Sequence, residues 1–247
     1  MEKYLIIDER MRVCEKEKLE QLGYSLVEIK KSNQVYEEIS SHVDIFACKI
    51  GEKLVIEPNQ YELIKQKLPQ GYCVSEGQEE IQKEYPGDIK YNVCVIGKKA
   101  LHAFKNTEPL IKQELEKENY KLINTSQGYT NCSIAVIDDN SAIVTDKGLY
   151  KILTKHNIDV LYLNYQPDIK LLQGQEYSNK NGFIGGAISR ISDKVIVTGD
   201  LDKIDKDNII REFIEKRNLE IIDFKGLDVI DYGGILEIWK GLKCHKQ

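Results

Sequence analysis

Short apolar runs recur along the chain, each opened by polar or small residues and closed by a turn. The first run, at 45–50, follows Ser41-His42-Val43-Asp44 and has the character of a strand. Successive openings are 46, 41, 54 and 48 residues apart. A near-constant period in this range is typical of propellers and repeat arrays. The five openings begin at His42, Asp88, Tyr129, Phe183 and Asp231.

After each of the first four turns, the pattern predicts a second strand, an amphipathic helix and a short closing strand. In the first repeat the second strand is expected at 54–57, directly before Pro58. The proline opens a helix whose apolar residues Ile64 and Leu68 lie four positions apart. A closing strand follows at 72–74. The sequence therefore predicts a series of ββαβ units.

The two chain ends each supply part of one further unit. Residues 4–8 read as a second strand, and a helix and a closing strand at 24–29 follow, but no first strand precedes them. Residues 234–239 read as a first strand with no helix after it. Joined, the ends complete a fifth unit and leave no open edge. We predict an α/β protein, with 1–247 forming one five-fold pseudosymmetric α/β propeller; the alternative is a plain two-layer α/β protein with coincidental periodicity.

Composition limits the partners. Of the 247 residues, 41% are apolar and 30% are charged, and the net charge of -5 argues against a nucleic-acid or anionic-membrane partner. No apolar run is long enough to span a bilayer and no signal peptide is visible, so a cytoplasmic protein is expected. The six cysteines form no CxxC pair, so no metal, cofactor or disulfide framework is expected. The oligomeric state is left open.

The candidate chemistry lies at the openings. His42 and Asp44 are two positions apart in an expected strand, so their side chains should project from one face. Asp88 and Asp231 occupy comparable openings, and three carboxylates that converge on one end of a ring would select a cation. The alternative is that His42 and Asp44 have a structural role only, as part of a hydrogen-bonded turn at the start of a strand.

Five ββαβ units with His-Val-Asp at the mouth of one resemble the pentein fold of the guanidino-group-modifying enzymes, which include arginine deiminase, dimethylargininases and amidinotransferases. The local motif is similar to the Gly-His-Val-Asp of agmatine and peptidylarginine deiminases, with Ser41 in place of the glycine. The overall look resembles an uncharacterised bacterial branch of this fold. The resemblance covers nearly the whole chain as an architecture, but its specific motif is four residues long.

The resemblance implies roles for individual residues. His42 would be the general acid and base, and Asp44 would contribute to catalysis by gripping a guanidinium. A planar, permanently charged guanidinium matches the geometry of a carboxylate. Lys90, Tyr129 and Asn131 would orient a carboxylate or amide at the other end of the ligand.

The nucleophile is less clear. Enzymes of this fold use a cysteine that follows a glycine-rich segment, but neither glycine pair here, at 185–186 or at 233–234, leads to one. Cys132 and Cys94 are the candidates. Strand alternation would turn Cys132 away from His42 unless a bulge redirects it, whereas Cys94 would share the face of His42 but lie about 20 Å farther along. The alternative for both is a buried structural thiol.

Three functions are weighed from the sequence. The first is a hydrolase, deiminase or amidinotransferase that acts on a guanidino or amidino compound through a covalent thiouronium intermediate. The second is a binding protein that kept the carboxylates and lost the cysteine. The third is a ribosome-associated factor on the same fold, which the acidic charge disfavours. The long segment 164–181 is either a lid or a floppy insert.

Overall fold

The computed structural model describes residues 3–172 and 180–240, which contain five three-stranded sheets with one common topology. In each sheet the middle strand runs antiparallel to one neighbour and parallel to the other. A helix connects the two parallel strands, so each sheet with its helix is a ββαβ unit. The protein is thus of the α/β class, and its sheets are separate rather than one closed sheet.

Four units follow the chain in order, and their bounds are these. The first contains β3 (Ala47–Ile50), β4 (Lys53–Ile56), α3 (Pro58–Lys65) and β5 (Cys73–Glu76). The second contains β6 (Cys94–Ile96), β7 (Lys99–His102), α4 (Pro109–Lys117) and β8 (Lys121–Asn124). The third contains β9 (Ile134–Asp138), β10 (Ser141–Val144), α6 (Lys147–Lys155) and β11 (Asp159–Tyr162). The fourth contains β13 (Ile188–Ile191), β14 (Lys194–Val197), α8 (Ile209–Glu215) and β15 (Glu220–Ile222).

The fifth unit joins the two ends of the chain. Strand β1 (Lys3–Asp8) lies between β17 (Leu236–Ile238) and β2 (Tyr24–Ile29), and α1 (Val13–Gln21) connects β1 to β2. Tyr4 pairs with Ile238 across the antiparallel β1–β17 contact. The pairing between chain ends that the repeat pattern predicts is therefore present.

The openings of three units are single helical turns, not the expected strands. They are α2 (Val43–Phe46), α5 (Thr130–Ser133) and α7 (Ile184–Ala187), and each leads directly into a first strand. In α2, the Val43 N–H donates to the Tyr232 carbonyl and the Asp44 N–H donates to the Gly233 carbonyl. Because the fifth unit satisfies these donors, the segment needs no strand partner and closes into a turn.

The segment 164–181 is partly a strand. Within it, β12 (Ile169–Leu171) pairs in parallel with β16 (Val229–Asp231), and neither strand was predicted. Residues 173–179 of this segment lie outside the described residues. Short 3₁₀ helices complete the described structure: η1 (Glu37–Ile39), η2 (Phe104–Asn106), η3 (Leu201–Lys203) and η4 (Lys206–Asn208).

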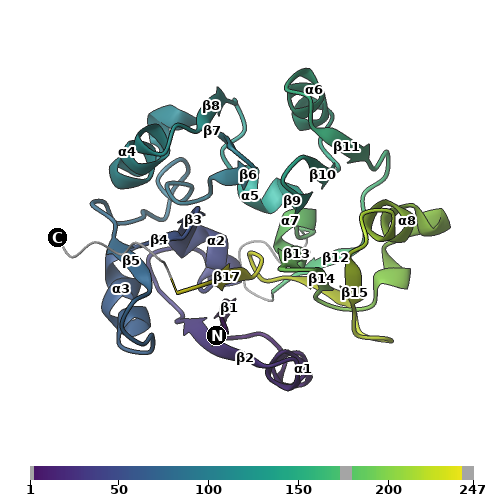
Figure 1. Cartoon of the computed structure of the whole chain (residues 1–247), viewed down its shortest axis with the longest axis horizontal. Coiled ribbons are helices and arrows are strands. Elements are labelled where there is room, and N and C mark those ends of the chain that lie inside the picture. The colour runs from purple at the N-terminus through teal and green to yellow at the C-terminus, as the bar shows by residue number, and fades with distance from the viewer. Residues whose placement is uncertain (1–2, 173–179, 241–247) are drawn as a thin grey trace.

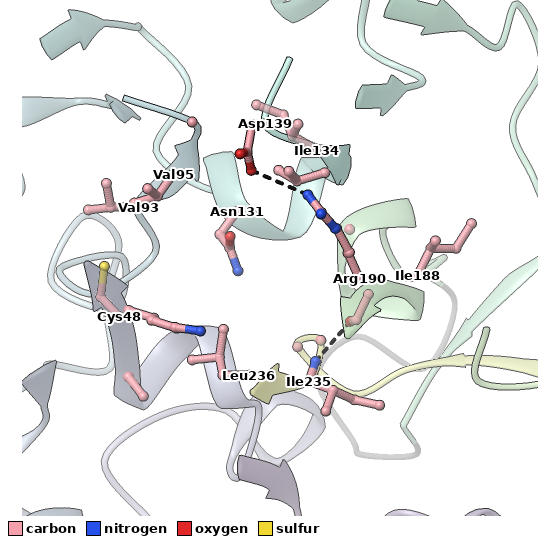
Figure 2. A pocket seen from close by; sticks show the side chains of 18 of the residues that line it. Cys48, Val93, Val95, Asn131, Ile134, Asp139, Ile188, Arg190, Ile235 and Leu236 are labelled. Atoms are coloured by element: carbon pink, nitrogen blue, oxygen red, sulfur yellow. Dashed lines mark hydrogen bonds and ion pairs between the residues drawn. The ribbon is translucent and has the colours of Figure 1, made fainter. Parts of the chain in front are cut away.

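The units surround a common centre. Figure 1 shows the long helices α1, α3, α4, α6 and α8 at the periphery, with α2, α5, α7 and β17 near the middle. A central cavity of about 300 Å³ is lined by the first strand of every unit. Figure 2 shows one lining residue from each: Cys48, Val95, Ile134, Ile188 and Leu236. No helix in the described ranges is long and apolar enough to cross a bilayer.

Candidate active site

A second cavity, of about 280 Å³, brings together five of the expected site residues: Tyr129 and the four described next. His42 and Asp44 come from the start of α2, Cys132 from α5, and Asp231 from the end of β16. We call this space the site cavity. All four side chains are buried, with exposures of 3% or less. Segments that are distant in the sequence thus assemble an imidazole, a thiol and two carboxyl groups in one water-poor space.

His42 is held beside Asp231. Its Nδ1 lies 3.8 Å from Oδ1 of Asp231, too long for a hydrogen bond, and within the described residues its buried Nε2 has no hydrogen-bond partner. Burial lowers the pKa of His42, while the charges of Asp231 and Asp8 raise it. The net lowering of the pKa favours the neutral imidazole, which is the form that can accept a proton.

A buried hydrogen-bond network holds the turn that precedes His42. The Ser41 hydroxyl donates to Oδ1 of Asp8 at 2.6 Å, and Nε of Arg10 donates to Oγ of Ser41 at 2.7 Å. Arg10 also forms an ion pair with Oδ2 of Asp8 at 2.9 Å. Ser41, which replaces the glycine of the similar motif, therefore ties the histidine turn to the end of β1.

Asp44 is a buried acid, and no cationic side chain of residues 3–172 and 180–240 forms an ion pair with it. Among the described residues, neither of its side-chain oxygens has a hydrogen-bond partner. Burial raises the pKa of Asp44 well above its usual range, the charge of Asp231 raises it further, and the nearby amides of Asn92 and Asn131 lower it. A buried carboxylate needs a paired charge or hydrogen bonds. A cationic ligand would supply both.

Asp231 is fixed in place by two backbone donors. Its Oδ2 accepts from the Phe183 N–H and its Oδ1 accepts from the Gly233 N–H, each at 2.8 Å. A Cβ on Gly186 would lie 1.7 Å from Oδ1 of Asp231, and one on Gly233 would lie 2.6 Å from Cβ of His42. The two glycine pairs thus provide room for the side chains of the site.

Cys132 faces the site cavity, so the expectation that it points away from His42 is wrong. That expectation assumed strand alternation, but Thr130–Ser133 is a helical turn. Its Sγ lies 3.6 Å from Oδ1 of Asn92 and 3.6 Å from the Tyr129 carbonyl. Burial raises the pKa of the Cys132 thiol well above its usual range, and the charges of Asp44 and Asp231 raise it further. In the free protein the thiol is therefore protonated at neutral pH.

Cys94, the other candidate nucleophile, lies outside the site cavity. It is fully buried in β6 and packs in an apolar cluster with Leu101 and Ile123. Burial raises the pKa of Cys94 to about 12. These surroundings are those of a structural thiol.

Of the other residues expected to bind the ligand, some line a cavity and some do not. Tyr129 lines the site cavity and donates its hydroxyl to the buried Asp88, which does not line the cavity. Lys90 pairs with Glu79 at 2.7 Å, also outside the cavity. Asn131 lines the central cavity, where Figure 2 shows its amide directed inward.

Several residues of the site had no signal in the sequence. The Asn92 amide links the first three openings: its Nδ2 donates to the Asp44 carbonyl at 3.3 Å, and its Oδ1 accepts from the Asn131 N–H at 2.8 Å. The rest of the cavity wall is mainly apolar or aromatic, and such residues read as core in a sequence. They include Tyr36, Ile39, Ile45, Leu171 and Phe183.

An acidic cluster elsewhere has its own counter-charge. Asp200, Asp202 and Asp223 place carboxylate oxygens within 4.8 Å of one another. Lys225 Nζ lies 3.2, 2.7 and 3.0 Å from these three side chains. The lysine thus occupies the position that a metal ion would take.

Sequence comparison places the chain in a family. The model of a family of unknown function, DUF6873, matches residues 6–236. The comparison with curated proteins finds no match.

Solved structures of low sequence identity share the fold. DDAH from Pseudomonas aeruginosa, in complex with citrulline, is 10% identical with a TM-score of 0.54, and 92% of each chain is covered. Inosamine-phosphate amidinotransferase from Streptomyces griseus is 10% identical with a TM-score of 0.57, covering 92% of this chain and 78% of that one.

A third similar structure is the product-bound N-terminal domain of an arginine dihydrolase from the ornithine-ammonia cycle in cyanobacteria. It is 10% identical with a TM-score of 0.55, and 97% of this chain and 98% of that one are covered. The chain belongs to the family of unknown function DUF6873, and its fold is the pentein fold of the guanidino-group-modifying enzymes.

Proposed function

We propose that the chain is an enzyme that hydrolyses or transfers the amidino group of a small guanidino or amidino compound. The observation that carries this proposal is the site cavity, which holds together the Cys132 thiol, the His42 imidazole and the Asp44 carboxyl, whose oxygens have no hydrogen-bond partner in the described part of the chain. A nucleophile, a base and a cation-binding acid are the groups that such a reaction requires.

Ligand binding would activate the thiol. A guanidinium or amidinium ion beside Asp44 and Asp231 favours the charged form of Asp44, because an opposite charge stabilises a carboxylate. The same positive charge favours the thiolate of Cys132, whose pKa is raised in the free protein by burial and by these two acids. The positive charge of the substrate thus opposes the rise of the thiol pKa.

The reaction follows from these roles. Cys132 gives its proton to His42 and attacks the amidino carbon, forming a carbon–sulfur bond. The departing amine takes the proton from His42, which leaves a thiouronium on the cysteine. Water, or an acceptor amine in a transferase, then loses a proton to His42, attacks the same carbon and breaks the carbon–sulfur bond. The thiol recovers its proton, so atoms and charge balance.

A binding protein without chemistry is the second candidate. The raised pKa of Cys132 favours it, because a thiol that stays protonated is a poor nucleophile. The two candidates share the cation-binding acids and differ only in whether the thiol reacts.

The proposed function is accompanied by a proposed architecture. We propose that the five ββαβ units form a single five-fold pseudosymmetric α/β propeller over 1–247, closed where β1 pairs with β17. The supporting observation is that the first strand of every unit lines the central cavity. In this arrangement the openings of the units meet at one end of the ring, where the site cavity lies.

The test is the reactivity of the thiol. Native protein is alkylated with a haloacetamidine across a pH series, and the modified cysteine is identified by peptide mass spectrometry. We expect labelling of Cys132 that guanidine prevents and whose rate is at least tenfold lower in His42→Ala, whereas labelling of the exposed Cys14 should change with neither. Cys94, which is fully buried and lines neither cavity, serves as an internal control that remains unlabelled.

The outcomes distinguish the two candidates. Labelling of Cys132 at the same rate with and without His42 would exclude the base role and leave the binding protein. Labelling that guanidine does not protect would exclude a guanidinium site in this cavity.

A further inference from the structure

The wall of the site cavity is apolar beyond its acidic groups. Ile39, Ile45 and Leu171 contribute aliphatic side chains, and Phe183 contributes an aromatic ring. Such a wall stabilises a ligand through buried apolar area and offers little to a second charged group.

The two tyrosines of the wall also act chiefly through their rings. The Tyr129 hydroxyl donates to Asp88, and the Tyr36 hydroxyl lies 3.4 Å from a carboxylate oxygen of Glu84. Since both hydroxyls are engaged by residues that do not line the cavity, the surface that each tyrosine adds to the wall is mainly aromatic.

An exposed aromatic row extends from this wall. The Tyr129 ring centroid lies 6.3 Å from that of Phe183 and 6.0 Å from that of Tyr85. Phe183 is 38% exposed and Tyr85 is 53% exposed. Large exposed aromatic residues beside a cavity are typical of a ligand-contacting surface.

The charges of the site cavity disfavour an anionic substituent. Apart from His42, the basic lining residue among the described residues is Lys180, which is exposed. An exposed lysine binds a carboxylate weakly. Asp44 and Asp231 would repel a carboxylate that approached them.

We propose that the substrate is a small guanidino or amidino compound whose remaining part is apolar and uncharged, an alkyl or arylalkyl chain without a carboxylate. The inference rests on the proposed function and names its substrate class. The cavity of about 280 Å³ is at the lower end of the range for small-molecule pockets, so the chain is a few carbons long. Its outer part contacts the row of Phe183, Tyr129 and Tyr85.

The test compares ligands that differ only at the tail. Binding of guanidine, butylguanidine and 4-guanidinobutyrate to the full chain is measured by isothermal titration calorimetry at one pH and ionic strength. We expect butylguanidine to bind at least tenfold more tightly than 4-guanidinobutyrate. It should also bind more tightly than guanidine, by about fourfold for each buried methylene.

Variants assign the preference to the wall. Phe183→Ala should reduce the ratio of butylguanidine to guanidine affinity about fivefold or more, whereas Leu63→Ala, at an exposed apolar residue of α3, should not change it. Stronger binding of 4-guanidinobutyrate, lost in Lys180→Ala, would overturn the inference. Equal binding of the matched pair would overturn it as well, while guanidine binding alone would leave the proposed function intact. Failure of all three ligands would refute both proposals.

Discussion

Asp44 shows at the scale of one residue how a binding group can oppose folding. Its carboxyl group is 1% exposed, and in the described structure no hydrogen bond reaches either oxygen. The raised pKa means that the folded state holds the proton more tightly than the unfolded state does. Stability from this group is present below the unfolded-state pKa and is lost as the pH rises through the folded-state pKa.

Asp44→Asn should therefore stabilise the free protein at neutral and alkaline pH. The amide removes a buried acid whose ionisation costs about 1.4 kcal/mol for each unit by which its pKa is raised. Urea denaturation from pH 4 to pH 9 should show an advantage of the variant that grows with pH and disappears in acid. If the variant is less stable than the native protein at pH 8, the Asp44 carboxylate must have a stabilising partner in the folded protein, and the prediction is wrong.

The same substitution should abolish binding of guanidine, because the neutral amide does not supply the charge. Binding to the native protein should tighten as the pH rises towards the raised pKa of Asp44, since the cation binds the deprotonated acid. Calorimetry in buffers of different ionisation enthalpy measures the proton released. Absence of proton release would mean that Asp44 is already charged in the free protein.

At the scale of elements, the one-turn helices at the openings separate what the sequence could predict from what it could not. The residue types at the openings predicted that His42 converges with Asp44, Asp88 and Asp231, and the site cavity contains all of these except Asp88. The face on which each side chain lies was not predictable, because α2 and α5 form against backbone groups of other units. Period-two reasoning therefore placed the candidate Cys132 on the wrong face, although its side chain lines the cavity.

The turn α7 provides a test of this element-level packing. Gly186→Ala would place a Cβ 1.7 Å from Oδ1 of Asp231, so the carboxylate must move. We expect a loss of about 1–3 kcal/mol of stability together with loss of guanidine binding. Urea denaturation and calorimetry measure the two effects.

Gly148→Ala is the matched control for that substitution. Gly148 lies in α6, where the added Cβ meets only the end of the Asp146 side chain, at 3.0 Å. Its stability should remain within about 1 kcal/mol of the native value, with unchanged binding. If Gly186→Ala binds guanidine with the affinity of the native protein, the position of Asp231 is not critical for binding.

For the molecule as a whole, the repeat was the most predictable feature. The spacing of the openings and the unpaired strands at the two chain ends were sufficient to predict the ββαβ units and the β1–β17 pairing. The β12–β16 pairing was not predictable, because these strands lie outside the repeat and are short. A sequence period reveals only the units that are repeated. Strands that lie outside the repeat add no periodic pattern to the sequence.

The β1–β17 pairing of the two chain ends leads to the last prediction. Ile238 is 3% exposed, pairs with Tyr4 and follows the Gly233-Gly234 segment that contacts α2. Ile238→Ser should cost about 3 kcal/mol or more, because it removes buried apolar volume and adds a polar group to the core. Leu63→Ser, at an exposed position on α3, should stay within about 0.5 kcal/mol of the native protein.

If the two ends close one cooperative ring, Ile238→Ser should unfold in a single transition at lower urea concentration. Guanidine should still raise its midpoint, because Ile238 lies outside the site cavity. A separate early transition confined to the fifth unit would mean that the terminal unit folds independently of the other four. The site would then depend on local docking of the chain ends rather than on a closed propeller.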